Sequence, residues 1–440
     1  MRDRRRYVLL LSTVLAEMLC LSAVYSQLTN SVVISSTGRI SAGVIARSGS
    51  ARDIQNAVDK IAAASGKGNV YIPAGLFNFV NVSESWATVS IPAGVNLFGA
   101  PTQRDANGQV IAWRTVLVMP YEVATSGPDD NPVWFSVQGN GDPNVSFRFS
   151  DIKLVGWRYF DNASTTQYAG ISISKVLNFR VDHSDFQDLA GSAIFAGSLP
   201  LVSYNRGNCS GVIDHNILNN TYGDPGFMNY DDRTLGYGIE MRRWASDVWD
   251  PTLTNIIGHY TPYTVFIEDN YFSKWRHGAD SNDGIHVVFR HNIVDGGYGI
   301  GEVDGHGSYA DSSNPYAVGT RCIEVYNNTF QNPDARWNSE TFALNLRGGS
   351  NIVVNNTIKG YYGLLDFNND WGNYVPYVPK CAVNQTYVWN NNLGSGILIH
   401  YPGDSQENVN YFLRAPNLQQ DGFTYTPYPY PNPLTLEGTP

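Results

Sequence analysis

The chain has 440 residues, of which 15% are charged, 42% are hydrophobic and 13% are aromatic, and its net charge is −10. This composition excludes a disordered chain, which would be poor in hydrophobic residues and rich in charge. The acidic balance, with no basic run beyond Arg6, argues against a nucleic-acid partner, because such a partner requires a basic face. The sequence therefore predicts a folded chain with ample apolar material for a core.

The first 26 residues are typical of an export segment. Three arginines at positions 4–6 precede an apolar stretch at 7–16, and small residues lie near a possible cleavage before Gln27. Glu17 interrupts the apolar run and disfavours a stable membrane span. We interpret residues 1–26 as a signal peptide, with a retained membrane anchor as the alternative. The expected location is secreted or at the cell surface, with membrane contact only through this segment.

The four cysteines show no zinc-binding spacing, and a disulfide between Cys322 and Cys381 is expected. In an exported protein, Asn-x-Ser/Thr sequons can carry glycans. Eight sequons occur, and the candidates for glycosylation are Asn81, Asn144, Asn162, Asn208 and Asn384.

Residues 27–49 form an N-terminal extension, and the first regular element is expected at Ser50–Ala64. There Ile54, Ala57, Val58 and Ile61 share one helix face. A helix with one polar face can close the exposed end of a stack of strands. This segment therefore predicts an N-terminal capping helix.

A repeat follows the helix: alternating apolar residues, a short polar run that ends in Asn, and a further apolar pair. It occurs at residues 212–218, 266–272 and 288–294 and returns three more times at intervals of different length. Variable intervals fit a solenoid whose rungs stack while its loops vary. Asn tolerates the left-handed conformation of a tight bend, and stacked Asn side chains can hydrogen-bond along a ladder. We therefore interpret the following residues as structural: Asn216, Asn270, Asn292, Asn328, Asn356 and Asn391.

A second short strand, often starting at Gly, follows each Asn turn, and a third, shorter strand completes the repeat. The clearest second strands are residues 238–242, 299–304, 343–347, 363–366 and 396–400. No helical period separates the strands, which excludes an alternating β/α fold. The sequence predicts an all-β fold, a single-stranded right-handed parallel β-helix with three sides, over residues 50–424. The Tyr/Pro-rich tail, residues 425–440, is expected to lie extended along the coil.

These features resemble the pectate-lyase-like superfamily of right-handed parallel β-helices. The resemblance covers about residues 50–433. It rests on the helix followed by Val-Tyr-Ile-Pro-Ala-Gly at 70–75, the Asn-Asn-Thr turns at 327–329 and 355–357, and the Tyr-Pro-Tyr-Pro-Asn-Pro-Leu ending at 428–434. It implies the fold but no single activity, because the superfamily includes lyases, hydrolases, epimerases, phage tailspikes and adhesins.

Ionisable side chains concentrate in the rungs between about residues 240 and 347. If Ile239, Val303 and Leu344 point inward, their neighbours point outward on one face, and rungs about 4.8 Å apart bring those neighbours together. Such clusters shift pKa values, which is frequent in active sites, although a solvated polar face is the alternative reading. The residues expected at a substrate-binding face are Glu240, Arg242, Asp280, Glu302, Asn345 and Arg347, and the catalytic candidates are Arg276, His277, Asp304 and His306.

The sequence Asp304-Gly305-His306 resembles the Asp-Pro-His element of mannuronan C5-epimerases. The resemblance implies that Asp304 and His306 are the catalytic acid and histidine. The chain departs from that element because Gly305 replaces Pro, Gly307 replaces an acidic residue, and no Tyr lies three residues before Asp304.

The first functional hypothesis is an enzyme that acts on a uronate-containing extracellular polysaccharide by β-elimination or C5 epimerisation. His306 or His277 would act as base or acid, and Asp304 would orient a histidine. Three arginines, Arg242, Arg276 and Arg347, would bind the sugar carboxylate. A calcium ion held by Glu240, Asp280 or Glu302 could replace an arginine.

Two alternatives remain open at this stage. An inverting glycoside hydrolase would use two carboxylates about 6.5–9.5 Å apart, such as Glu240 and Glu302. A non-catalytic glycan-binding surface protein or adhesin would use the 27 Tyr and 10 Trp residues as stacking platforms for sugars. The sequence does not identify the oligomeric state.

Overall fold

The computed structural model describes most of the chain. The described residues are 32–34, 40–81, 87–106, 108–120, 133–156, 169–189, 191–197, 208–220, 236–242, 256–306, 319–334, 340–367, 383–403 and 405–436. Among them, no helix has both the length and the apolar character needed to cross a membrane. The predicted export segment, Asn162 and Cys381 lie outside these residues.

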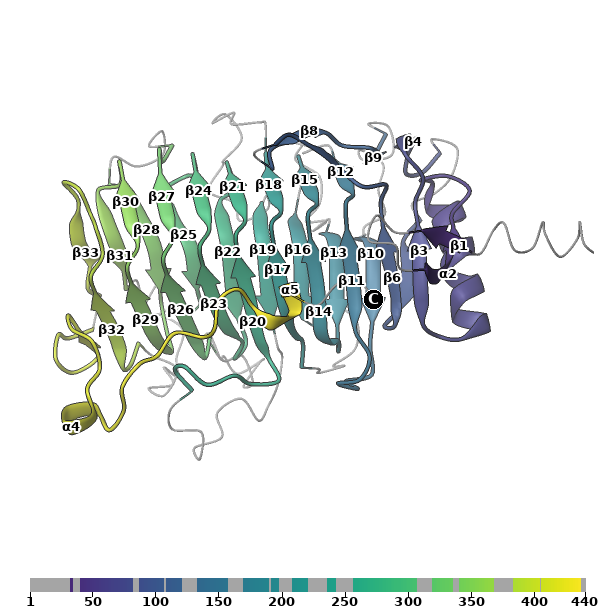
Figure 1. The fold of residues 1–440 in the computed structure, drawn as a ribbon. Coiled ribbons are helices and arrows are strands. Elements are labelled where there is room, and N and C mark those ends of the chain that lie inside the picture. Colours follow the sequence, from purple (N-terminus) through teal and green to yellow (C-terminus); the bar gives the residue numbers. More distant parts are fainter. Residues whose placement is uncertain are drawn as a thin grey trace, which may run out of the picture.

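The described residues form a three-sided parallel β-helix, as the sequence predicts (Figure 1). Each side is one sheet whose strands come from successive turns of the chain. Sheet I contains β1 (Val32–Ile34), β2 (Ile40–Ile45), β3 (Gly68–Tyr71), β6 (Val95–Phe98), β11 (Phe147–Ser150), β14 (Leu177–Asp182), β17 (Ser210–Asp214), β20 (Thr264–Glu268), β23 (His286–Arg290), β26 (Cys322–Tyr326), β29 (Ser350–Val354), β32 (Thr386–Trp389) and β34 (Tyr411–Phe412).

The other two sides follow the same order along the chain. Sheet II contains β5 (Val89–Pro92), β10 (Val133–Gln138), β13 (Ala169–Ser174), β16 (Ser192–Gly197), β19 (Tyr237–Arg242), β22 (His277–Asn282), β25 (Ile300–Gly305), β28 (Phe342–Leu346), β31 (Gly363–Asp366) and β33 (Ile397–Tyr401). Sheet III contains β4 (Gly75–Asn78), β9 (Thr115–Val118), β12 (Lys153–Val155), β15 (Asp185–Gln187), β18 (Ile217–Asn219), β21 (Tyr271–Ser273), β24 (Ile293–Asp295), β27 (Thr329–Gln331) and β30 (Thr357–Lys359). A separate antiparallel pair joins β7 (Gln103–Arg104) and β8 (Val110–Ala112).

The core lies inside the coil, where inward side chains of successive rungs stack on one another. On sheet I, Ile213, Ile267, Phe289, Val325 and Val353 are fully buried and belong to one apolar cluster. Burial of each such side chain stabilises the fold by about 1.5–3 kcal/mol. Alternation along each strand sends the intervening residues outward.

The Asn repeat forms the predicted ladder at the corner between sheets I and III. The amide nitrogen of Asn270 donates to the side-chain oxygen of Asn292 at 3.1 Å, and Asn292 donates in turn to Asn328 at 3.2 Å. The same bond joins Asn216 to Asn270, Asn328 to Asn356 and Asn356 to Asn391.

One detail of the corner differs from the expectation. The left-handed residue of each bend immediately precedes the ladder Asn, for example His215 (φ 55°) and His291 (φ 56°). The ladder Asn itself uses its buried amide to bond the next rung.

The N-terminal end is closed by α2 (Ala51–Ala64), whose face of Ile54, Ala57, Val58 and Ile61 is buried as expected. The Ser50 side chain accepts a hydrogen bond from the backbone N–H of Asp53 and caps the helix. The stack begins before residue 50, because β2 pairs in parallel with β3.

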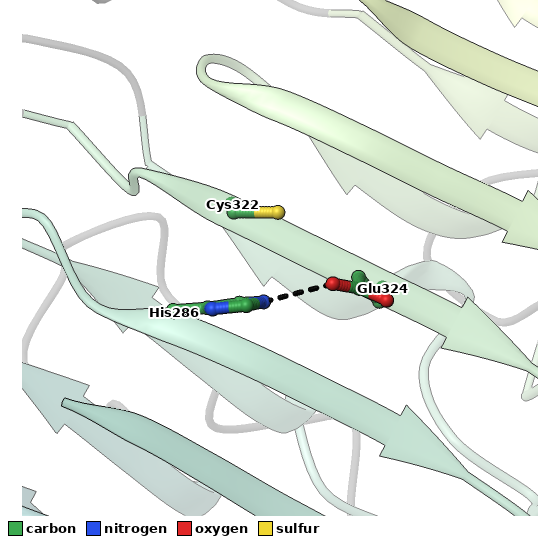
Figure 2. Close-up of side chains that lie close together, drawn as sticks. All are labelled: His286, Cys322 and Glu324. Carbon is green, nitrogen blue, oxygen red and sulfur yellow. Dashed lines mark hydrogen bonds and ion pairs between the residues drawn. The ribbon is translucent and has the colours of Figure 1, made fainter. Parts of the chain in front are cut away.

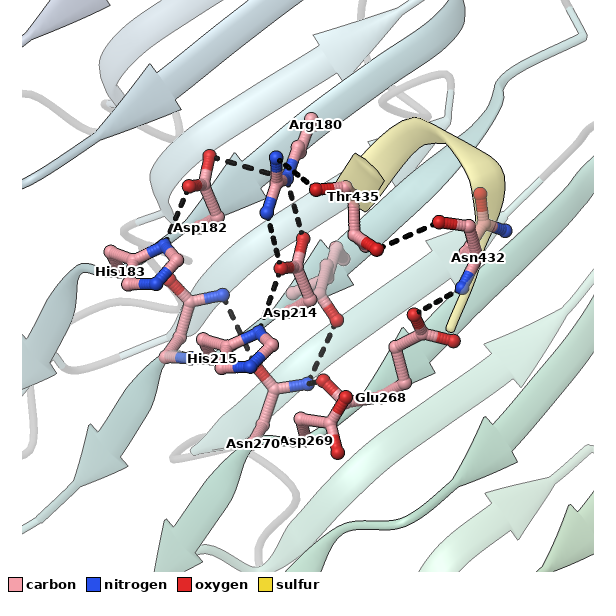
Figure 3. Close-up of polar contacts among 12 residues, drawn as sticks. Arg180, Asp182, His183, Asp214, His215, Glu268, Asp269, Asn270, Asn432 and Thr435 are labelled. Carbon is pink, nitrogen blue, oxygen red and sulfur yellow. Dashed lines mark hydrogen bonds and ion pairs between the residues drawn. The ribbon is translucent and has the colours of Figure 1, made fainter. Parts of the chain in front are cut away.

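The C-terminal tail crosses the outer face of sheet I, where Figure 1 draws it in yellow over the strands. After the short helix α4 (Leu418–Asp421) it runs extended to α5 (Pro433–Leu436). Arg290 donates to the carbonyl of Tyr428, and the backbone N–H of Asn432 donates to Glu268. Figure 3 shows this end of the tail beside polar side chains of β14, β17 and β20.

Two further sequence predictions concern single residues. Cys322 is a buried thiol, and its predicted disulfide stays a prediction, because Cys381 lies outside the described residues. Of the predicted glycosylation sites, Asn81, Asn144 and Asn384 are exposed and Asn208 is half-buried.

Candidate functional site

Four strands of sheet II place most of the predicted site residues on one outer face. Register pairs Glu240 of β19 with Asp280 of β22, Asp280 with Asp304 of β25, and Asp304 with Asn345 of β28. Since neighbouring strands lie about 4.8 Å apart, these four side chains form one row across the sheet. His306 directly follows β25.

Asp304 is the centre of this row. One of its oxygens, Oδ2, bonds Arg347 and lies 3.2 Å from His306 Nε2 and 3.9 Å from His277 Nε2. Asp280 lies 3.1 Å from the same nitrogen of His306. The structure therefore brings together the Asp304, His306, His277 and Arg347 that the sequence selected.

These contacts shift the pKa values of Asp304 and His306. Burial raises the pKa of Asp304, but Arg347 and the two histidines outweigh it and hold that pKa well below its usual range. Burial and Arg347 lower the pKa of His306. Asp280 and Asp304 raise it by a larger amount, so the pKa lies above its ordinary value. His306 is 18% exposed, whereas the side chains of both carboxylate partners are fully buried.

The pKa of His277 is shifted in the opposite direction. Burial lowers its pKa to about 4, although Asp304 opposes the shift. Its Nδ1 faces the carbonyl oxygen of Gly301, and its ring stacks on Tyr237 at 5.5 Å. His277 is therefore neutral at physiological pH. The half-buried Arg276 adds a positive charge that lowers the pKa of His277 further.

The Glu240 end of the row is a bonded pair. Arg242 lies 2.6 Å from Glu240 Oε1, and the Ser192 hydroxyl donates to Oε2 at 2.6 Å. Burial nevertheless raises the pKa of Glu240, with Arg242 opposing it. Ser192 was not predicted, since it lies on an earlier rung where the sequence repeat is weak.

Asp283 completes the cluster and was absent from the predicted site residues. It directly follows β22, in a left-handed conformation (φ 54°), and is 1% exposed. Neither of its oxygens has a hydrogen-bond partner among the residues that the structure describes, and the same holds for Asp280 Oδ2 and for Asp304 Oδ1. Burial raises the pKa of Asp283 to about 7, with Arg242 and His306 opposing the shift. The Asp-Gly turn at 283–284 is a sequence signal for a bend, but not for this burial.

Glu302 does not lie on this face, and its predicted placement is wrong. Its Oε1 accepts hydrogen bonds from the backbone N–H of Gly299 and from Tyr361, which belongs to the interior apolar cluster. The register shifts between Ile300 and Val303, so strict alternation fails at that point of β25. Burial raises the pKa of Glu302 to about 8. Glu240 and Glu302, the carboxylate pair expected for a hydrolase, therefore do not lie on the same face.

Three residues of this face could together hold a metal ion. Asp280, Asp304 and His306 have ligand atoms that all lie within 4.8 Å of one another. Calcium takes about six to eight oxygen ligands, whereas this set includes a nitrogen. Of the expected calcium ligands, Glu302 points elsewhere and Glu240 is already bonded to Arg242 and Ser192. The residues present do not fit the expected calcium site.

Comparison with known proteins shows the fold. No protein-family model and no curated protein matches the chain. Among solved structures, the chain is similar to PfbA, a surface adhesin of Streptococcus pneumoniae, at 12% identity and a TM-score of 0.50, covering 81% of this chain and 77% of that one. An alginate lyase from Paenibacillus sp. str. FPU-7 matches at 13% identity and a TM-score of 0.46, covering 80% and 95%. The A-module of the Azotobacter vinelandii mannuronan C-5 epimerase AlgE4 matches at 13% identity and a TM-score of 0.38, covering 81% and 96%.

Proposed function

We propose that this parallel β-helix protein acts on a uronate-containing extracellular polysaccharide by removing the proton from C5 of the uronate. That step begins both β-elimination and C5 epimerisation. The observation that carries the proposal is His306, held between Asp280 and Asp304 beside buried carboxylate oxygens without partners. Buried polar groups are normally satisfied, so a cluster that lacks partners is expected where a substrate supplies them.

His306 has the arrangement of a base. Its Nε2 faces two carboxylates and is assigned the proton, which leaves Nδ1, without a partner among the described residues, to accept the proton of C5. The imidazolium that forms is stabilised by Asp280 and Asp304, in the way that a buried aspartate supports a catalytic histidine. Because its pKa is raised, His306 is a stronger base than free imidazole, and the fraction in the neutral form that accepts the proton increases as the pH rises.

The positive charges of the face suit the acidic sugar. Removing the C5 proton develops negative charge on the neighbouring carboxylate, and guanidinium groups stabilise that charge. Arg242 and Arg347 lie on the face, and Arg276 lies beside His277. Asp304 acts as a positioning residue, because it orients both His306 and Arg347.

Elimination and epimerisation differ in where the electron pair of the C5–H bond goes. In elimination, the C5–H pair forms the C4–C5 double bond, the C4–O bond breaks, and the leaving oxygen takes the proton from the His306 imidazolium. In epimerisation, C5 takes a proton from the opposite side of the ring instead. Asp283, protonated below its pKa of about 7, is the acid that we assign to that second transfer.

The test is a product screen with alginate, polygalacturonate and glycosaminoglycans. Ultraviolet absorbance of unsaturated uronate is expected for elimination, and a changed epimer ratio without chain cleavage is expected for epimerisation. Both are expected to disappear in His306→Ala and Asp304→Asn. Release of reducing ends without ultraviolet absorbance would instead establish a hydrolase. Binding of intact glycan with no turnover would establish the adhesin alternative, and either result overturns the proposal.

A further inference from the structure

A second cluster of ionisable side chains lies on the outer face of sheet I, far from the row on sheet II. His286 begins β23, and its register partner on β26 is Cys322. Glu324 lies two residues beyond Cys322, so both side chains point to the same side of the strand. Figure 2 shows the three side chains together, and their ligand atoms all lie within 4.8 Å of one another.

This cluster is sealed by the C-terminal tail. All three side chains are fully buried. Around them, Phe266, Val288 and Ile352 form an apolar layer on which Tyr425 and Tyr428 of the tail pack. Any charge here is therefore costly unless an opposite charge balances it.

The charge of Glu324 has no permanent counter-charge. Asp182, Asp214 and Glu268, the other buried carboxylates of this face, each lie beside a guanidinium group at 2.6–2.7 Å. Within the described part of the chain, the ion-pair partner of Glu324 is His286 alone, at 3.0 Å, and a histidine carries charge only when protonated. A divalent cation bound by a thiolate, a carboxylate and a neutral imidazole makes the set neutral.

The surrounding contacts match those of a metal site. The Nδ1 of His286 lies 3.2 Å from the Thr264 hydroxyl, and a metal-binding histidine typically donates its other N–H to such a neighbour. The Tyr425 hydroxyl donates to Glu324 Oε2 at 2.7 Å, which orients the carboxylate. The buried Tyr428 hydroxyl has no hydrogen-bond partner among the described residues, and its ring lies 6.4 Å from that of His286.

We propose that His286, Cys322 and Glu324 bind a zinc ion, which fastens the C-terminal tail to sheet I. Thiolate, imidazole and carboxylate are the ligands that zinc takes, and a tetrahedral site needs ligand atoms roughly 3.3–3.8 Å apart, from bond lengths of about 2.0–2.3 Å. His286 Nε2 and Glu324 Oε1 are 3.0 Å apart and joined by a hydrogen bond, which the ion replaces as the two atoms separate by a few tenths of an ångström. The ion displaces the thiol proton of Cys322, whose pKa burial and Glu324 otherwise hold well above its usual range.

The test measures metal content in the full-length chain, produced with zinc in the medium and purified under reducing conditions. About one zinc per chain is expected, and a chelator is expected to remove it slowly and to lower the thermal midpoint. Exchange for cobalt is expected to produce the near-ultraviolet charge-transfer band of a cobalt–thiolate bond. These readouts do not depend on catalytic activity.

Cys209→Ser is the matched control, because Cys209 is the other buried free thiol in the described residues and lies away from this cluster. Cys322→Ser and His286→Gln are expected to lose the zinc and the cobalt band, whereas Cys209→Ser retains both. Wild-type chain without zinc, or equal zinc in Cys322→Ser and wild type, overturns the proposal. The three side chains would then be a hydrogen-bonded network under the tail.

Discussion

Two faces of the same β-helix carry buried carboxylates, and the two faces differ in how those carboxylates are bonded. On sheet I, both oxygens of Asp182, Asp214 and Glu268 have donors: arginines, histidines, or the tail's backbone. Figure 3 shows the bonds from Arg180 to Asp214 and from Asn432 to Glu268. On sheet II, both oxygens of Asp283, Asp280 Oδ2 and Asp304 Oδ1 lack hydrogen-bond partners among the described residues. We infer that the carboxylates of sheet I stabilise the fold, whereas those of sheet II remain available to bind a ligand.

The largest expected effect is on activity. Replacing His306 by Ala removes the proposed base, so turnover is expected to fall by about 100- to 10,000-fold. Some stability is also expected to be lost, because the buried Asp280 and Asp304 lose a partner, so the rate is compared per folded molecule. Initial rates and denaturant unfolding of the same preparations measure both quantities.

His215 is the matched control, since it also lies beside a buried aspartate, at 2.9 Å from Asp214, but on sheet I. His215→Asn keeps a residue that tolerates the left-handed bend. Its activity is expected to equal that of the wild type. An equal loss in both variants would contradict the division between the two faces.

Breaking an ion pair on sheet I should affect stability instead. Arg290→Met leaves Glu268 buried without its guanidinium, which is expected to destabilise the fold by about 3–5 kcal/mol. Adding Glu268→Gln should restore most of the lost stability, because the unpaired charge disappears. Urea unfolding of the single and double variants measures the difference, while the rate per folded molecule should stay unchanged.

The pH dependence of stability should reveal Asp283. Its carboxyl keeps a proton up to a pKa of about 7 in the folded chain, against 3.8 ordinarily. Between these values the folded state binds more protons than the unfolded state, so stability falls as the pH rises through this window. The loss is at most about 4 kcal/mol, from roughly three pKa units of about 1.36 kcal/mol each.

Asp283→Asn is neutral throughout this window and is expected to flatten that part of the stability curve. Thermal unfolding midpoints between pH 4 and 8 give the comparison with the wild type. If the thermal midpoint of Asp283→Asn depends on pH as that of the wild type does, the Asp283 carboxylate is solvated.

The smallest expected effect concerns the Asn ladder. Asn292→Ala removes an amide that donates to Ile267 and Asn328 and accepts from Asn270, and is expected to cost about 1–3 kcal/mol. Asn391 lies at the C-terminal end of the ladder and is only partly buried. Replacing it by Ala should lower the free energy of unfolding by less. Equal losses in denaturant unfolding would contradict a ladder that is strongest in its middle.

The repeat predicted most of the fold because it reflects local rules that every rung shares. Alternation fixed which residues face the core, and the Asn spacing identified the ladder. Glu302 was misplaced because a register shift in β25 is invisible to an alternating pattern. Asp283 was missed because its burial depends on side chains of other rungs, which sequence distance does not show. The left-handed bend was assigned one residue too late, at Asn216 instead of His215, since both residue types tolerate it.

The central claim, removal of the C5 proton by His306, is tested most directly by proton magnetic resonance of the polysaccharide in heavy water. Wild-type protein is predicted to produce either a new vinyl proton or a loss of the C5 proton signal through deuterium exchange. His306→Ala should produce neither, while His215→Asn should match the wild type. A C5 proton signal that stays intact while wild-type protein cleaves or binds the polymer would contradict the account.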